Sequence, residues 1–511
     1  MAKPKLSPPV IRQLIILSIC RLAEPVSLTS VSPYLYYMVK SFGIPHKDIP
    51  FYVGITFACF SLAQFFTGIF WGRVSDRFGR KPTMLLGLSG SLLFILIFGF
   101  STSLPMAILA RCFSGLVNGN VGILRTIVAE MVPQRELQPR AFSVMPLIWT
   151  MGSIVGPSIG GFLADPITNH PNWFKGEPPA LLKKFPFCLP NLASAVIFVC
   201  GLFTGALFLK ETLETKRNAP DRGRRIGKNM IRFFSLKSRR HRDDVPDETT
   251  SLFADSSSSR IDEEVNFPAE VIKDSGPPPL VQAFTFQSTV NIIMYCLLSL
   301  HSVTFDQLLP VLMSYPRDDT PRQGLKFAGG FAMPSSSIGL YYSIYGVIGM
   351  FLQFLIFPSV VGAFGPLRTL RCCSLVFLVL YFLVPFTLLL PRAHQHLALF
   401  LCIFVKGVSA TFAFPCNTIL LTNSSPSLRI LGTLNGIAVA LAALSKGVGP
   451  ALGGVAFTLG QKTGYGILPW CLLSGVTTLG ILPLVLLVEG ECLPNKPLRE
   501  DGDDETRPLA K

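Results

Sequence analysis

Twelve long apolar stretches fill most of this chain, six on each side of a polar segment at 211–280. An α-helix needs roughly 20 apolar residues to cross a bilayer, and these stretches meet that length. Only 15% of the residues are charged, whereas a soluble domain carries about 25%. The sequence therefore predicts an all-α membrane protein with twelve transmembrane helices in two six-helix pseudo-repeats. The predicted spans are 13–39, 50–71, 83–102, 104–129, 141–165, 190–209, 282–313, 337–361, 368–390, 395–421, 431–458 and 465–488.

Composition divides the chain into five parts. The central linker holds a basic block at 216–242, a serine run at 256–259 and three prolines at 277–279. High charge and low hydrophobicity predict that this linker is disordered. The predicted parts are an N-terminus at 1–12, a first half at 13–210, the linker at 211–280, a second half at 281–489 and an acidic tail at 490–511.

The segment WGRVSDRFGRKP at 71–82 connects the second and third apolar stretches. It surrounds Asp76 with four cations, so we expect an ion-pair cluster that can close and open. Gly72 and Gly79 are expected to let the backbone turn tightly between antiparallel helices. An ordinary basic membrane loop would explain the charges, but not the spacing of both glycines and the aspartate.

The distribution of basic residues predicts the orientation in the membrane. Cations gather at 72–81, at Arg135 and Arg140, in the linker, and at Arg368, and such segments face the cytoplasm. Both termini are then expected to be cytoplasmic. The net charge of +15 follows this topology, so we do not expect a nucleic-acid partner.

The 71–82 segment resembles the loop between the second and third helices of the major facilitator superfamily, G-x3-D-(R/K)-x-G-R-K. The resemblance implies a gating role for this loop, with Glu130 and Arg140 in the same charge cluster. On this basis, Asp76→Asn is predicted to leave the protein inserted but to slow transport. The matching residues are Gly72, Asp76, Arg77, Gly79, Arg80 and Lys81.

An internal repeat supports two related halves. GSIVGPSIGG at 152–161 recurs as SKGVGPALGG at 445–454, 293 positions later. The first copy is similar to the fifth-helix signature of proton-coupled antiporters of the superfamily; generic packing of small residues is the alternative explanation. The residues concerned are Gly152, Gly156, Pro157, Gly160, Gly161, Gly449, Pro450, Gly453 and Gly454.

Ionisable residues inside predicted spans indicate function, because each needs a partner or a watery cavity. Glu24 and Asp306 are the carboxylates of this kind. Arg111 resembles the fourth-helix arginine with which family members couple transport to protons, and we expect it near Glu24. Arg21 lies three residues before Glu24, and the two side chains could instead simply neutralise each other. Lys406 and Lys446 are further candidates.

Four polar residues are candidates for a substrate cavity, although their spacing alone does not separate this role from helix packing. They are Tyr34, Asn118, Gln307 and Asn417. Motifs of hydrolases and of ATP-driven pumps are absent. We therefore expect no enzymatic activity, no cofactor and no metal site, and a protein that functions as a monomer.

The whole pattern resembles a twelve-helix drug:proton antiporter, with a small molecule, protons and the lipid bilayer as partners. The segments 20–25 and 71–81 are similar to the zinc-induced facilitator-like group of plants and fungi. The chain departs from that group because its linker has only His241 and no Cys-Pro-Gly-Cys element is present. A non-transporting sensor of the same fold is the alternative, and the sequence leaves open the plasma or the vacuolar membrane.

Overall fold

The computed structural model describes nearly all of the two halves and the beginning of the linker. The described residues are 7–132, 137, 141, 144–174, 176–216, 220–230, 284–318, 325–424 and 428–488. Most of the linker and the acidic tail lie outside them, as does Arg140.

Each of the twelve apolar stretches contains at least one helix. In the first half these are α1 (Pro8–Ser30), α2 (Leu35–Ser41), α3 (Ile49–Phe78), α4 (Arg80–Gly99), α5 (Leu104–Val117), α6 (Asn120–Met131), α8 (Val144–Leu163) and α11 (Cys188–Phe208). The second half contains α14 (Phe286–Ser314), α15 (Ser335–Phe351), α16 (Phe357–Phe364), α17 (Pro366–Leu383), α18 (Arg392–Asn423), α19 (Leu428–Thr463) and α20 (Leu468–Leu486). Short helices α9 (Pro166–Asn169) and α10 (Ala180–Lys184) follow α8.

The all-α class is confirmed, and several spans are interrupted. Within the described residues, nine helices are long and apolar enough to cross a membrane, or ten if α1 and α2 form one span bent by 57°. The apolar part of α8, Leu147–Leu163, is shorter. The eighth stretch is divided by a π-helical turn at Leu352–Ile356, between α15 and α16.

The turn after α3 is much tighter than predicted. We expected a loop of about ten residues, but α3 continues to Phe78 and α4 begins at Arg80. Gly72 is therefore helical, and Gly79 alone makes the turn, with a φ of 107° that favours glycine. Gly365, with a φ of 77°, makes the same one-residue turn between α16 and α17. The two halves thus share this one-residue turn, although the segment at 361–369 has no residue equivalent to Asp76.

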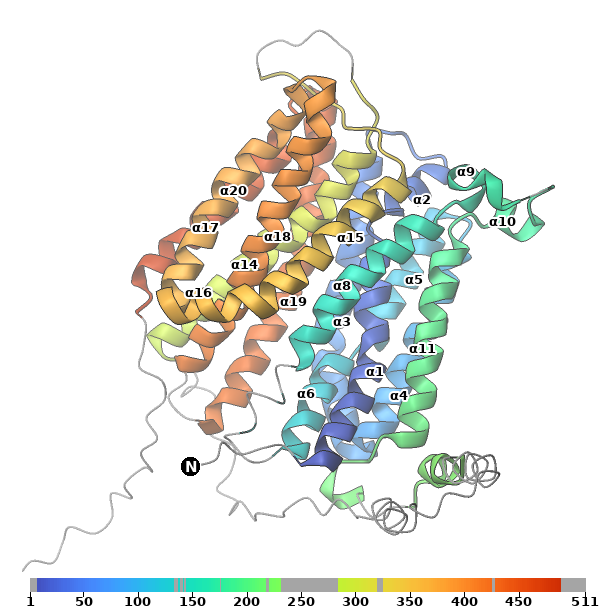
Figure 1. The fold of residues 1–511 in the computed structure, drawn as a ribbon, viewed down its shortest axis with the longest axis vertical. Coiled ribbons are helices and arrows are strands. Elements are labelled where there is room, and N and C mark those ends of the chain that lie inside the picture. Colours follow the sequence, from blue (N-terminus) through green and yellow to red (C-terminus); the bar gives the residue numbers. More distant parts are fainter. Residues whose placement is uncertain are drawn as a thin grey trace, which may run out of the picture.

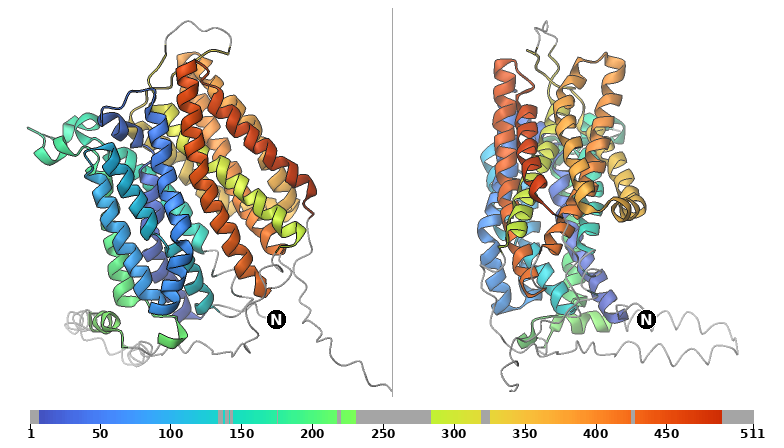
Figure 2. Two further views of the ribbon diagram at one scale, coloured as in Figure 1. Left: turned by 180° about the vertical axis from the view of Figure 1, so that it is seen from behind. Right: turned by 90° about the vertical axis from the view of Figure 1, so that its left-hand side faces the viewer.

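The helices form two bundles that lie side by side (Figures 1 and 2). In Figure 1 the first half is coloured blue to green and the second yellow to red, and α8 lies next to α15. Glycines allow the bundles to touch by their backbones. A Cβ on Gly161 would lie 2.6 Å from the Cα of Gly339, and one on Gly54 would lie 3.2 Å from the Cα of Gly454. The contacts of α8 with α15 and of α3 with α19 therefore join the halves.

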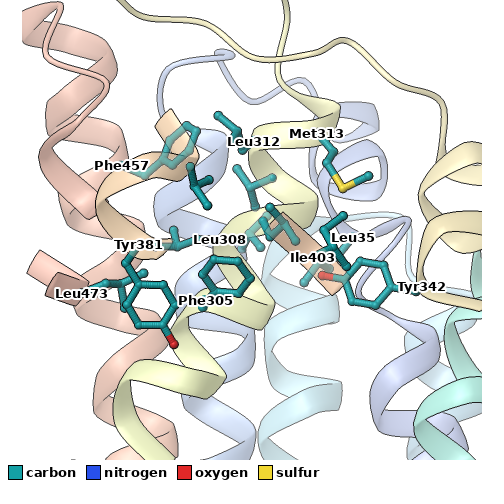
Figure 3. Close-up of a cluster of buried hydrophobic side chains, with 14 of the residues drawn as sticks. Leu35, Phe305, Leu308, Leu312, Met313, Tyr342, Tyr381, Ile403, Phe457 and Leu473 are labelled. Atoms are coloured by element: carbon teal, nitrogen blue, oxygen red, sulfur yellow. The ribbon is translucent and has the colours of Figure 1, made fainter. Parts of the chain in front are cut away.

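Buried apolar side chains form a core that includes residues of both halves. Figure 3 shows part of it, with Phe305 of α14 beside Tyr381 of α17 and with Leu308 and Leu312 further along α14. Leu35 of the first half belongs to the same cluster. This core surrounds the middle of α14, where the next residue after Phe305 is charged.

The first part of the linker is folded, contrary to the predicted disorder. Residues 222–230 form a helix, which we name the linker helix and which lies beyond the end of α11 in Figure 1. A Cβ on Gly227 would lie 2.5 Å from the carbonyl oxygen of Leu207, and Gly223 approaches Ala206 as closely. The two glycines therefore let the linker helix pack directly on the end of α11.

Candidate functional site

The first half contains a buried ion pair within one turn of α1. Arg21 donates a hydrogen bond to the carboxylate of Glu24, and the residues are only 8% and 3% exposed. Their spacing of three positions places both side chains on one face of the helix. Glu24 is therefore paired with Arg21 in this structure, which is the alternative that the sequence left open.

Arg111 lies elsewhere in the first half, among aromatic rings. Its guanidinium carbon is 5.9, 5.0 and 5.6 Å from the ring centroids of Phe57, Phe60 and Phe98. Rings at this distance stabilise a cation through their negative faces. Among the described residues, the Nε of Arg111 has no hydrogen-bond partner, and the ion pair of Glu24 is with Arg21 and not with Arg111.

The second half contains an ion pair between α14 and α18. Lys406 donates a hydrogen bond to Asp306. The lysine side chain is 4% exposed, whereas that of Asp306 is 47% exposed. Lys406 also lies 5.3 Å from the ring centroid of Phe305. Lys406 is therefore a buried partner of Asp306.

Aromatic and polar side chains surround this second pair. Phe305 stacks on Tyr381 with ring centroids 5.1 Å apart, as Figure 3 shows. The Tyr381 hydroxyl is 2.9 Å from Nδ1 of His301. His301 is thus a hydrogen-bonded core histidine. Asp306 is left as the half-exposed titratable group in the middle of α14.

Residues of the 71–82 segment form ion pairs with one another and with Glu130 and Asp221. We name this group the gating cluster: Asp76, Arg80, Lys81, Glu130 and Asp221. Arg80 donates to Asp76 and, at 3.1 and 3.0 Å, to Glu130. Lys81 donates to Asp221 at 2.6 Å. Sequence reasoning placed Asp76 and Glu130 together, and the structure agrees with that placement.

The sequence did not single out Glu211 and Asp221, because both lie in the segment predicted to be the linker. Glu211 accepts hydrogen bonds from the backbone N–H groups of Arg80 and Lys81 at 2.9 and 3.1 Å, and so caps the start of α4. Burial alone would raise the pKa of Asp221, but the hydrogen bond from Lys81 and its charge outweigh this and hold that pKa below its ordinary value. The linker helix is thus anchored at neutral pH.

Asp76→Asn is expected to slow transport only a few-fold, because the Asp76 side chain is 64% exposed and an exposed ion pair contributes about 0–1 kcal/mol. Glu130→Gln is expected to have the larger effect. Glu130 accepts two hydrogen bonds from Arg80 and a third, 2.5 Å long, from Thr212. Turnover per inserted molecule in membrane vesicles measures both variants. Equal rates for the two variants would contradict this ranking.

The repeated glycine-proline motifs lie where helices meet. In α8, Gly156 and Gly160 face α1 so closely that a Cβ on either would overlap Thr29 or Ser30. In α19, a Cβ on Gly453 would lie 2.5 Å from Thr304 of α14. Gly152, Pro157 and Gly161, and Gly449, Pro450 and Gly454, belong to the same two helix segments.

The four cavity candidates lie within the packing of separate halves. Tyr34 donates a hydrogen bond to Asn191 at 3.2 Å and stacks on Phe187. Asn118 interrupts the fourth span between α5 and α6, where its carbonyl oxygen accepts a bond from Gln64. Gln307 and Asn417 are buried with side-chain polar atoms that have no partner in the described structure.

The end of the molecule opposite the gating cluster holds contacts between the halves. Asp48, at the start of α3, pairs with Lys462 near the end of α19 at 2.5 Å. Tyr37 donates a hydrogen bond to the carbonyl oxygen of Met333, and Asn169 donates one to Ser335 at 3.1 Å. These polar contacts connect the halves at that end.

Known proteins resemble this chain over almost its full length. Residues 17–329 match the family described as Major Facilitator Superfamily. The "Major facilitator superfamily multidrug transporter mfsB" of Aspergillus fumigatus is 37% identical over 97% of this chain and 86% of its own length. "Protein ZINC INDUCED FACILITATOR-LIKE 1" of Arabidopsis thaliana is 28% identical over 90% of this chain and 88% of its own.

The fold agrees with a solved structure as well. The crystal structure of a D-xylose-proton symporter has a TM-score of 0.59 at 12% identity, over 94% of this chain and 98% of the other. At that identity the likeness concerns the fold alone. The matches in sequence and the two bundles of helices agree: this chain belongs to the major facilitator superfamily and is a multi-pass membrane transporter.

Proposed function

We propose that the protein is a proton-coupled antiporter that moves a small organic molecule out of the cytoplasm by alternating access. The relatives whose names include "multidrug transporter" and "Efflux pump" favour export. The basic residues of the 72–81 segment and of the linker helix favour a cytoplasmic location for that end of the molecule. Both termini are then cytoplasmic.

The observation that carries this proposal is the Asp306–Lys406 pair. The Asp306 side chain is 47% exposed on a membrane-spanning helix, and a carboxylate there is costly unless it faces a partner or a water-filled cavity; we expect such a cavity to bring protons to Asp306. Protonation of Asp306 removes the counter-charge of the buried Lys406 and changes which conformation is favoured. Such a group can bind a proton on one side of the membrane and release it on the other.

Purified full-length protein in proteoliposomes tests the proposal, with a panel of drugs, organic acids and divalent metals as substrates. Uptake into vesicles with an acidic lumen is expected to exceed uptake at equal pH several-fold and to collapse with a proton ionophore. Gradient-independent uptake would show a transporter that is not coupled to protons. Binding without any movement would identify a sensor of this fold.

Glu24→Gln is expected to abolish gradient-driven transport and to spare substrate exchange at equal pH. The substitution removes the carboxylate that neutralises Arg21. A buried carboxylate binds or releases a proton when the water and the charges around it change. Full gradient-driven transport by Glu24→Gln would reduce Glu24 to a structural partner of Arg21 and leave Asp306 as the proton-binding residue.

A further inference from the structure

The membrane-spanning helices carry an excess of positive charge. Away from the helix ends, the described spans contain two carboxylates, Glu24 and Asp306, and five cations. The cations are Arg21, Arg111, Arg125, Lys406 and Lys446. The two carboxylates pair with Arg21 and Lys406, which leaves three positive charges without a carboxylate. Charges inside a membrane are costly unless something of opposite sign joins them.

Two of these three cations lie on helices of different halves. Arg125 lies on α6 and Lys446 on α19, which Figure 1 shows on facing sides of the two bundles. Neither forms an ion pair in the described part of the chain. The charge of Lys446 instead interacts with those of Arg125 and Arg21. Among the described residues, Glu24 is the only carboxylate that pairs with any of these three cations.

An aromatic ring lies next to these charges. The Nζ of Lys446 is 6.0 Å from the ring centroid of Trp149 on α8, and Trp149 is 42% exposed. The helix that carries this ring is held against α1, because Gly152, one turn later, packs on Pro25 of α1. Thr29 also donates a hydrogen bond of 3.1 Å to the carbonyl oxygen of Gly152. Arg21 is four residues before Pro25, so α1 and α8 fix the tryptophan relative to the cations.

Arg111 does not belong to this group. Three phenyl rings enclose its guanidinium within the first half, whereas Lys446 lies 6.0 Å from a single ring. The excess charge that remains accessible between the halves is therefore that of Arg125 and Lys446.

We propose that Arg125 and Lys446, assisted by Arg21, bind the carboxylate of an aromatic organic anion, whose ring packs on Trp149. A guanidinium and an ammonium both donate charge-assisted hydrogen bonds to a carboxylate. An exposed indole ring offers an apolar surface for stacking. This inference rests on the proposed function and adds to it the chemical class of the substrate: an aryl carboxylate rather than a neutral or cationic compound.

Direct binding to the purified full-length protein in detergent tests the site without relying on transport. The probes are 2-naphthoate, the neutral 2-naphthamide and the cationic 2-naphthylmethylammonium, which share one ring system and differ in charge. By isothermal titration calorimetry, 2-naphthoate is expected to bind at least about tenfold more tightly than the amide, since bonds to charged groups are the strong ones. Equal affinity for acid and amide, or tighter binding of the ammonium, would overturn the proposal.

Substitutions then locate the site. Lys446→Gln and Arg125→Gln are each expected to reduce the preference for acid over amide by about tenfold, and Lys446→Arg is expected to keep it. Lys40→Gln, which removes an exposed cation on α2, is the matched control and should leave the preference unchanged. A preference that persists in both glutamine variants would place the anion elsewhere. If one glutamine variant does not fold, the other glutamine variant and Lys446→Arg still test whether these cations bind the anion.

Two further outcomes separate the possible explanations. If phosphatidylglycerol but not 2-naphthoate raises the Tm, and Lys446→Gln removes that shift, the cations hold a lipid headgroup and the substrate assignment is wrong. If 2-naphthoate binds as expected but no pH gradient drives its uptake, the anion site stands and the antiport function fails. Proton-driven transport of a neutral compound, without tighter binding of the acid, would support the antiport function and overturn the anion site.

Discussion

Asp306→Asn is expected to abolish transport driven by a pH gradient and to destabilise the second half. Lys406 is 4% exposed, and it would then remain buried without a counter-charge. Loss of one partner of a buried pair costs about 3–5 kcal/mol, with the lower end of that range applicable because Asp306 is half-exposed. Proton-driven uptake in proteoliposomes measures the first effect, and the Tm of the purified protein measures the second.

The double variant Asp306→Asn/Lys406→Met separates coupling from stability. Methionine fills a similar volume without a charge, and replacement of both partners of a buried pair is often neutral. The Tm should therefore recover while gradient-driven transport stays absent. Recovery of coupled transport in the double variant would mean that Asp306 serves only to neutralise Lys406, and the proton would have to bind at another group.

Gly54→Leu is expected to disrupt the contact between α3 and α19. A Cβ at this position would overlap the carbonyl oxygen of Pro450 and lie 3.2 Å from the Cα of Gly454. These are backbone atoms, which cannot move aside as a flexible side chain can. The substitution is therefore expected to destabilise the protein by about 3 kcal/mol, the upper end of the range typical of overpacking. Loss of this contact favours conformations in which the two halves are apart at that end.

Cross-linking measures this effect directly. Cysteines at positions 48 and 462, where the native Asp48 and Lys462 form an ion pair of 2.5 Å, should cross-link readily in an otherwise unchanged chain. Gly54→Leu is expected to lower the cross-linked fraction several-fold. Gly68→Leu is the matched control on the same helix, because nothing lies within 4 Å of a Cβ there. A similar loss in both variants would argue against a specific role for the Gly54 contact.

Hydropathy predicted the helices well because each span must be apolar wherever it meets lipid. It failed at the turn after α3, since residues 72–78 extend the helix beyond the apolar stretch, where polarity no longer distinguishes helix from loop. The linker helix was missed for a related reason. Its charge and low hydrophobicity suggest disorder, whereas Gly223 and Gly227 dock it on α11 through backbone contacts.

The sequence indicated the charged residues of the candidate site, but not which cation pairs with which carboxylate. Glu24 and Asp306 stand out in the sequence because carboxylates are rare in membrane spans. Their partners depend on the three-dimensional positions of long side chains. The sequence offered both Arg21 and Arg111 for Glu24, and only the aromatic surroundings of Arg111 in the folded protein distinguish them. Lys406 and Asp306 are 100 residues apart, so no local pattern links them.

The excess of cations between the halves also has an electrical consequence. A membrane potential changes the energy of an elementary charge by about 2.3 kcal/mol per 100 mV if that charge crosses the whole membrane. In the proposed alternating-access cycle, Arg125 and Lys446 are exposed first to one aqueous side and then to the other, and their charges thus pass through part of that field. The proposed bound anion would cancel much of their charge, so the loaded protein is expected to respond weakly to voltage. The empty protein keeps the charge, and a potential that is negative inside therefore holds it with its cations facing the cytoplasm.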